Sequence, residues 1–428
     1  MNASSSQRGS QTQAAPLDVN WVRMQFPSLK QVVSGHPAAF LDAPAGTQVP
    51  RCVIDAVCDY FESSNANTCG AFITSRRTDE MIAAARLAMA DFFNCDSDEV
   101  FFGPNMTTMT FALARGIGRD LRPGDEIVVT MLDHDANVAP WRALEERGVI
   151  VRQVDIREDD CTLDMADLRR KITDRTKLIA VGYASNAVGT VNPVEEIVRL
   201  AHDAGALIFI DAVHYAPHGT IDVRRLDCDF LACSPYKFFG PHMGCIYGKR
   251  DLLLRFRPYK VRPAPETLPD RWETGTQIHE GLAGVSAAVD YIASLGHRCD
   301  PSAANRRAAI VSAHHAMREY EMRLAVQMIP GLLEIAGLRF YGISDLSRFG
   351  ERVPTVSVRL AKGKPLDAAK FLGDRGIFTW DGNYYALNLT ERLGVEKDGG
   401  FLRIGLVHYN TAEEVERLLS TLHEFAAS

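Results

Sequence analysis

The chain has 428 residues, of which 46% are hydrophobic and 24% are charged, and its formal net charge is −7. This composition is typical of a globular protein with a large core, and it excludes fibrous and wholly disordered classes. The mildly acidic balance offers no basic footprint for nucleic acid or for an anionic membrane surface. No run approaches the ~18 apolar residues that a membrane span needs. We therefore expect no nucleic-acid partner and no membrane span.

The first 16 residues and the cysteines indicate where the protein works. Residues 1–16 are rich in Ser, Gln, Asn and Ala and lack the basic start and apolar block of a secretory signal, so we predict a disordered tail. The nine cysteines include no CxxC pair and no regular spacing with histidines. We expect neither a disulfide framework nor a metal site, and a reducing, cytoplasmic location.

Short apolar segments alternate with helical patterns between about residues 20 and 296. The predicted strands are 127–130, 178–184, 207–212, 230–234 and 245–248, and the predicted helices are 78–93, 107–116, 137–147 and 193–204. Nearly continuous apolar strands are typical of a sheet buried on both faces. The alternation predicts an α/β fold with a mainly parallel, seven-stranded type of sheet flanked by helices.

A smaller α+β domain is predicted to follow. Asp300 and Pro301 read as the N-cap and first residue of a helix that ends before Pro330 and separates the domains. Thr411 and Glu414 form a capping-box pattern. Further elements are the predicted strands 353–360, 377–380 and 402–407 and the helices 366–375 and 411–425. The expected division is a tail (1–16), an N-terminal segment packing with the small domain (17–40), a large domain (41–298) and a small domain (299–428).

Two residues at the ends of neighbouring strands suggest a cofactor. Asp211 ends the segment Leu-Ile-Phe-Ile-Asp, and Lys237 follows the next strand in Ser-Pro-Tyr-Lys. A lysine that forms an imine with an aldehyde and a carboxylate that pairs with a protonated pyridine nitrogen are what pyridoxal phosphate requires. On their own, a loop-capping Asp and a surface Lys are the simpler explanation of this pair.

Three further segments follow predicted strands, where ligands gather in open α/β sheets. Residues 105–107, Asn105, Met106 and Thr107, open a helix whose N-terminus suits a phosphate, although a plain N-cap explains them equally. His134 offers a flat ring for stacking on an aromatic cofactor, or is an ordinary loop histidine. Asn186 offers an amide to a cofactor or substrate oxygen, or is a turn residue.

These motifs together resemble the class V aminotransferase and cysteine desulfurase group of fold-type I pyridoxal phosphate enzymes. The resemblance runs from about residue 20 to the end of the chain. It is carried by Phe40-Leu-Asp-Ala, Asp133-His134-Asp135-Ala-Asn, Ser185-Asn186-Ala-Val-Gly-Thr190, Asp211-Ala-Val-His214, Ser234-Pro-Tyr236-Lys237 and Thr274-Gly-Thr276.

The resemblance implies a role for each matching residue. Lys237 is the implied Schiff-base lysine, Asp211 the pyridinium partner and His134 the stacking residue. His214 lies beside the cofactor phenolic oxygen, where many relatives have Gln, and Arg403 grips the substrate carboxylate unless it forms a surface ion pair. The implied phosphate ligands are Ser234, Tyr236, residues 105–107 and, from the second subunit of a homodimer, Thr276.

The chain departs from the desulfurase pattern where a mobile cysteine accepts sulfur. Tyr385 stands at the matching position, Trp380 is near a place often held by a second arginine, and residues 301–428 contain no cysteine. We therefore expect no persulfide transfer by that route. Trp380 and Tyr385 either pack on a bulky or apolar substrate group or belong to the small-domain core. A relocated thiol at Cys69 is a further alternative.

The first hypothesis for the reaction is a C–S β-lyase acting on an S-substituted cysteine, because such an elimination needs the retained residues and no acceptor cysteine. Aminotransferase, epimerase and decarboxylase chemistry are the alternatives, since all begin with the same residues. The alternative of another class is a non-catalytic, desulfurase-like scaffold.

Overall fold

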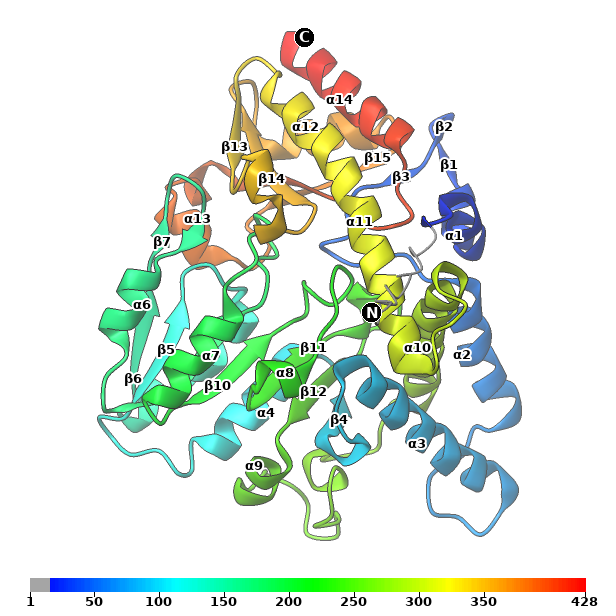
Figure 1. Ribbon diagram of the computed structural model, residues 1–428, viewed down its shortest axis with the longest axis vertical. Coiled ribbons are helices and arrows are strands. Elements are labelled where there is room, and N and C mark those ends of the chain that lie inside the picture. Colours follow the sequence, from blue (N-terminus) through cyan, green and yellow to red (C-terminus); the bar gives the residue numbers. More distant parts are fainter. Residues whose placement is uncertain (1–15) are drawn as a thin grey trace, which may run out of the picture.

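A seven-stranded mixed sheet forms the centre of the computed structural model, which describes residues 16–428 (Figure 1). The spatial order is β4 (Val100–Gly103), β12 (Gly244–Gly248), β11 (Phe230–Cys233), β10 (Leu207–Asp211), β9 (Thr176–Gly182), β5 (Glu126–Thr130) and β6 (Ile150–Val154). Only β12 runs antiparallel to its neighbours among these seven strands. The prediction of a mainly parallel sheet is confirmed.

Alternate residues of the central strands pack into two different cores. Ile208 and Ile210 of β10 face the core built with α3 (Ile73–Phe93), α7 (Val194–Asp203) and α10 (His279–Cys299). Phe209, between them, faces the core built with α4 (Met106–Ile117) and α5 (Ala139–Arg142). The apolar runs therefore arise because both faces of each strand are covered. The remaining helices of this part are α2 (Arg51–Ser63), α6 (Met165–Lys171), α8 (Val223–Leu226) and α9 (Arg250–Arg255).

The C-terminal part forms an antiparallel sheet covered by helices. Its strand order is β13 (Leu338–Tyr341), β14 (Thr355–Leu360), β17 (Phe401–Gly405) and β16 (Trp380–Gly382). The helices are α11 (Arg306–Leu333), α12 (Pro365–Gly373), α13 (Leu387–Arg392) and α14 (Ala412–Ala427), the last with the predicted Thr411 and Glu414 capping box. The domain limits given above stay a proposal.

The N-terminal segment links the two parts of the chain. Its helix α1 (Val19–Gln25) is followed by the hairpin β1 (Val32–Val33) and β2 (His36–Pro37), and β3 (Ala39–Phe40) pairs with β15 (Ile377–Phe378). A small hairpin, β7 (Ile156–Arg157) and β8 (Thr162–Leu163), follows β6. Apart from Pro16, the tail predicted at 1–16 lies outside the described residues. No helix in the described part of the chain is long and apolar enough to cross a membrane.

The predicted helix that starts at Asp300 is wrong at both ends. Asp300 is the C-cap of α10, where its N–H donates to the Gly296 carbonyl at 2.8 Å. The next helix, α11, begins at Arg306, because Asn305 supplies the N-cap and accepts from the Ala308 N–H at 2.9 Å. Pro330 lies inside this helix rather than after it. It is close to the C-terminal end, where the buried Ile329 and Leu332 hold the last turn in the core.

Two other predicted elements are divided in the structure. The helix predicted at 137–147 is a 3₁₀ turn, a single α turn and a second 3₁₀ turn. Pro140 in this stretch cannot donate a helical hydrogen bond. The strand predicted at 377–380 is split between β15 and β16, which belong to different sheets. The second strand carries Trp380 to the edge of the main cavity.

Candidate active site

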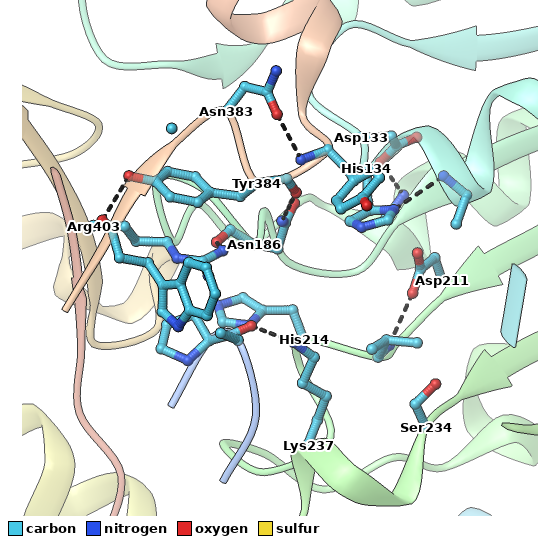
Figure 2. Close-up of a pocket in the computed structure, with 18 of the residues that line it drawn as sticks. Asp133, His134, Asn186, Asp211, His214, Ser234, Lys237, Asn383, Tyr384 and Arg403 are labelled. Carbon is cyan, nitrogen blue, oxygen red and sulfur yellow. Dashed lines mark hydrogen bonds between the residues drawn. The ribbon is translucent and has the colours of Figure 1, made fainter. Parts of the chain in front are cut away.

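A cavity of about 640 Å³ lies beyond the carboxyl ends of β9 and β10 and against the edge strand β16 (Figure 2). Thr276 and Cys69 are exposed and do not line it. Every other predicted site residue lines it, namely Asn105, Met106, Thr107, His134, Asn186, Asp211, His214, Ser234, Tyr236, Lys237, Trp380, Tyr385 and Arg403.

Lys237 ends the 3₁₀ turn Pro235–Lys237 that follows β11, and its side chain is 8% exposed. Its Nζ donates to the Pro44 carbonyl and lies 4.7 Å from the centre of the Tyr236 ring. Burial and then the charge of Arg403 lower the pKa of Lys237 to about 7. About half of the free amine at this position is therefore unprotonated near pH 7 and can act as a nucleophile and base.

Asp211 is the last residue of β10 and is 9% exposed. Its Oδ1 accepts from the Val213 N–H at 2.9 Å, and no cationic side chain among the described residues forms an ion pair with it. Burial raises the pKa of Asp211 to about 6. A buried carboxylate without a counter-charge is costly, so this site favours a cationic ligand group.

The part of the cavity at the N-terminus of α4 suits an anion. Asn105 caps α4 by accepting from the Thr108 N–H at 2.8 Å, and this bond leaves the N–H groups of Met106 and Thr107 without an acceptor in the described chain. The Asn105 backbone packs closely against Gly244 of β12. Only a glycine fits there, because a Cβ would be 2.4 Å from the Asn105 carbonyl carbon. The buried Ser234 also lines this cavity. These donors can bind a phosphate at the positive helix end.

His134 and Tyr385 form one aromatic wall of the cavity. Their rings are stacked, with centroids 5.3 Å apart and an interplanar angle of 25°. His134 Nδ1 accepts from the Ala136 N–H at 3.0 Å, so this histidine also caps a 3₁₀ turn. Burial and the charges of Lys237 and Arg403 lower the pKa of His134 to about 4. The ring is therefore neutral at ordinary pH and can stack on another flat ring.

Arg403 is 4% exposed and forms no ion pair with any described carboxylate. The alternative of a surface ion pair is therefore wrong. Its Nη1 donates to the Asn186 carbonyl at 2.9 Å, and its guanidinium carbon lies 4.0 Å from the centre of the Tyr384 ring. The rest of the guanidinium fork is available for a carboxylate in the cavity.

The loop that carries Tyr385 is fixed to the large domain. Tyr384 and Tyr385 both have positive φ, at 56° and 59°. The Asp135 N–H donates to the Tyr385 carbonyl at 2.7 Å, and Asn186 Nδ2 donates to the Tyr384 carbonyl at 2.9 Å. Asn383 Oδ1 accepts from the Tyr385 N–H at 3.0 Å. Tyr385 is 71% exposed and Trp380 is 51% exposed, so neither belongs to the small-domain core.

Sequence reasoning missed the part that Asp133 plays in this geometry. Asp133 Oδ1 accepts from the Gly182 N–H at 2.6 Å, and Oδ2 accepts from Asn137 Nδ2 at 3.3 Å. Burial and the nearby Asp211 raise the pKa of Asp133 to about 8. The residue ties the His134 turn to the end of β9. The motif Asp133-His134-Asp135-Ala-Asn already contains this residue, directly before His134. The motif does not show, however, that the Asp133 side chain is buried.

Comparisons with known proteins agree on one family. The aminotransferase class-V family description matches residues 39–418. A cysteine desulfurase of Dickeya dadantii is 33% identical over 422 residues, covering 95% of this chain and 96% of the relative. A probable cysteine desulfurase of Synechocystis is 32% identical, covering 94% of each chain.

Solved structures give the same result. The apo cysteine desulfurase of Thermococcus onnurineus has a TM-score of 0.83 and 26% identity, covering 94% of this chain and 99% of its own. The cysteine desulfurase CsdA of Escherichia coli has a TM-score of 0.80 and 25% identity, covering 96% and 98%.

The fold and these matches define a fold-type I, pyridoxal phosphate-dependent enzyme. The chain belongs to the class V aminotransferase family and is cysteine desulfurase-like. The cavity fits the cofactor, because it offers a buried amine, an uncompensated carboxylate for a ring nitrogen and free N–H groups for a phosphate. In addition, the buried Asn186 Oδ1 has no partner in the described chain.

Proposed function

We propose that the enzyme is a C–S β-lyase that cleaves S-substituted cysteine, with pyridoxal phosphate held in the 640 Å³ cavity. Lys237 binds the cofactor aldehyde, Asp211 pairs with its ring nitrogen and His134 stacks on the ring. His214 and Asn186 contact the ring oxygen. The phosphate is held by Ser234, Tyr236 and the Asn105, Met106 and Thr107 turn. When bound, the cofactor withdraws electrons from the substrate Cα.

The residue at the desulfurase cysteine position carries the proposal. Tyr385 occupies that position, and none of the nine cysteines lines the cavity. Its loop is also held by the hydrogen bonds from Asp135 and Asn186, whereas a persulfide carrier must move. The side chains that elimination needs are all in the cavity. Elimination therefore fits this site better than sulfur transfer to a protein thiol.

The protein groups act on the substrate in an order that their positions support. Arg403 binds the substrate carboxylate as a fork, and Lys237, as a neutral amine, removes the Cα proton. The Cβ–S bond then breaks, and the sulfur keeps the electron pair and takes up a proton. Water completes the reaction, so that S-substituted cysteine and water give a thiol, pyruvate and ammonia.

The sulfur substituent is proposed to be bulky and apolar. Trp380 and Tyr385 are half or more exposed on the cavity side of the small domain. An aromatic ring offers a large, rigid contact surface to an apolar group. Cysteine itself would leave these surfaces uncovered.

A homodimer and a cytoplasmic location are also proposed. Thr276 lies outside the cavity of its own chain, near the exposed apolar Ile278. A second subunit would cover this surface and receive Thr276 at its phosphate site. Sedimentation should give twice the chain mass; a monomer that still binds the cofactor would contradict the dimer. The location is supported by nine free cysteines.

The reaction is tested with a panel of S-methyl, S-benzyl and S-phenyl cysteines. We expect equal amounts of thiol, pyruvate and ammonia, with a preference for the aryl substrates. Keto acid without thiol would contradict the lyase and favour an aminotransferase. Inverted Cα configuration would favour an epimerase, and carbon dioxide release a decarboxylase. Sulfur transfer from cysteine at a higher rate would restore a desulfurase.

A further inference from the structure

A buried hydrogen bond beside the cavity joins a turn of the large domain to a strand of the small sheet. His214 Nε2 lies 3.0 Å from Thr355 Oγ1, and the two residues are 4% and 0% exposed. His214 is in the turn after β10, whereas Thr355 begins β14. The imidazole ring lines the cavity, but Thr355 does not. Thr355 can therefore act on a bound group only through His214.

The hydroxyl of Thr355 decides where the proton of His214 lies. In the part of the chain that the structure describes, this hydroxyl has no hydrogen-bond partner except His214 Nε2. If Nε2 carried the proton, the Thr355 hydroxyl hydrogen would be buried without an acceptor, which is unfavourable. If Thr355 donates to Nε2, both groups are satisfied. A neutral His214 then carries its proton on Nδ1.

The free nitrogen of His214 is open to the cavity. Nδ1 has no partner among residues 16–428, and it is not enclosed, unlike the unpartnered Nδ1 atoms of His314 and His408. The ring therefore presents one N–H donor to whatever occupies the cavity. A glutamine at this position would also present an N–H donor to the cavity. Its amide nitrogen always carries protons, so it would not need Thr355 to fix the donor.

Thr355 is held rigidly in its place. Its carbonyl accepts from Arg352 Nη2 at 2.6 Å, and its N–H donates to the Val353 carbonyl at 2.8 Å. Opposite it on β17 is Gly405, where a Cβ would meet Thr355 Oγ1 at 3.2 Å. Arg352 is fully buried, and its partners in residues 16–428 are all backbone carbonyls. The backbone of Thr355 is therefore fixed beside His214.

The charges around His214 favour its neutral form. His218 packs against it with ring centroids 5.6 Å apart, and His218 Nδ1 lies 2.7 Å from the buried Glu321 Oε2. Lys237 and Arg403 also face it. Burial, followed by the neighbouring His218, Lys237 and Arg403, holds the pKa of His214 well below its ordinary value. The His214 ring is therefore neutral at ordinary pH and has a single N–H to donate.

We propose that Thr355 is a positioning residue that fixes His214 in the Nδ1–H form, so that His214 donates a hydrogen bond to the cofactor ring oxygen. This inference rests on the proposed placement of the cofactor. The donor draws negative charge from the ring oxygen, which then stabilises the positive charge on the cofactor-bound Lys237 nitrogen less strongly. Loss of the donor should raise the pKa of that nitrogen.

The first test measures the visible absorption of the cofactor-loaded enzyme against pH. Thr355→Val should raise the midpoint of the colour change by about 1 to 2 pH units, the effect of one hydrogen bond to a charged group. Thr355→Ser keeps the hydroxyl and should stay within about 0.2 pH unit of the wild type. In a His214→Gln background, Thr355→Val should cause no further shift, because the amide donates without Thr355.

An unchanged midpoint in Thr355→Val would overturn the proposal, as would an equal shift in the His214→Gln background, which indicates a merely structural effect. The second test is ¹⁵N NMR of histidine-labelled wild-type protein without cofactor. A proton on His214 Nδ1 is expected, and a proton on Nε2 overturns the proposal even if Thr355→Val does not fold. Absence of any cofactor band in the wild type would instead contradict the proposed function.

Discussion

Trp380 and Arg403 are directly paired across the antiparallel strands β16 and β17. Directly opposite residues point to the same face of a sheet, with Cβ atoms about 4.5 to 5.5 Å apart. Both line the cavity. A substrate whose carboxylate is bound by Arg403 is therefore within reach of the Trp380 indole. The pairing of β16 with β17 therefore places the apolar indole of Trp380 beside the side chain of a substrate that Arg403 holds by its carboxylate.

Replacing Trp380 tests the apolar surface. Trp380→Ala should lower kcat/KM for S-benzyl cysteine about 2- to 12-fold, because an aromatic contact contributes about 0.5 to 1.5 kcal/mol. The change for S-methyl cysteine should be smaller. Tyr259→Ala, which removes an exposed ring outside the cavity, is the matched control and should leave both values unchanged. Equal losses for the two substrates would argue against an apolar pocket.

Arg403→Lys keeps the positive charge but loses the planar fork. We expect kcat/KM for every amino-acid substrate to fall about 10- to 150-fold, the equivalent of about 1.5 to 3 kcal/mol from a charged hydrogen bond. The loss should be shared by all side chains, since the carboxylate is common to them. Arg339→Lys, on the exposed side of β13 in the same sheet, should have no effect. A normal Arg403→Lys enzyme would remove Arg403 from the substrate site.

Much of this arrangement was predictable from the sequence. Apolar runs gave the central strands, and the residues that follow them, such as Asp211 and Lys237, were placed at one edge because parallel strands end together. The N-cap at Asn105 and the capping box at Thr411 were also predictable, because a cap depends on a few consecutive residues.

Other features depend on contacts that no local pattern contains. The bond between His214 and Thr355 joins residues 141 positions apart in the chain. The burial of Arg403 depends on the contact between the small sheet and the Asn186 turn, and the burial of Asp133 depends on how the His134 turn packs against the end of β9. The start of α11 was misplaced because Asp300 and Asn305 are both good caps; Asp300 instead ends α10, which packs closely against α11 at Gly296.

Asp211→Asn should stabilise the protein without cofactor at neutral pH while abolishing cofactor binding in its coloured form. The carboxyl has a pKa of about 6 when folded, above its ordinary 3.8, so folding at pH 7 keeps a buried charge at a cost of the order of 3 kcal/mol. The wild type gains stability as pH falls from about 6 to 4, because only the folded state takes up the proton.

Denaturant unfolding of the two cofactor-free proteins from pH 4 to 8 measures this difference. The stability advantage of Asp211→Asn should be largest above pH 6 and should vanish near pH 4. Asp381→Asn, at a less buried carboxyl that lines the same cavity, is the control for the loss of a carboxylate there. A constant difference across the pH range would contradict the assigned burial cost of Asp211.

Lys237 is the residue that is proposed to bind the cofactor and to begin thiol release. The most direct test of this role compares visible absorption and thiol release from S-benzyl cysteine for the wild type, Lys237→Ala and Lys30→Ala, whose exposed lysine lies outside the cavity. The wild type and Lys30→Ala should show a visible band and release thiol with equal pyruvate, whereas Lys237→Ala should lose the protein-linked band and the activity. An unaltered band and undiminished thiol release in Lys237→Ala would contradict the account.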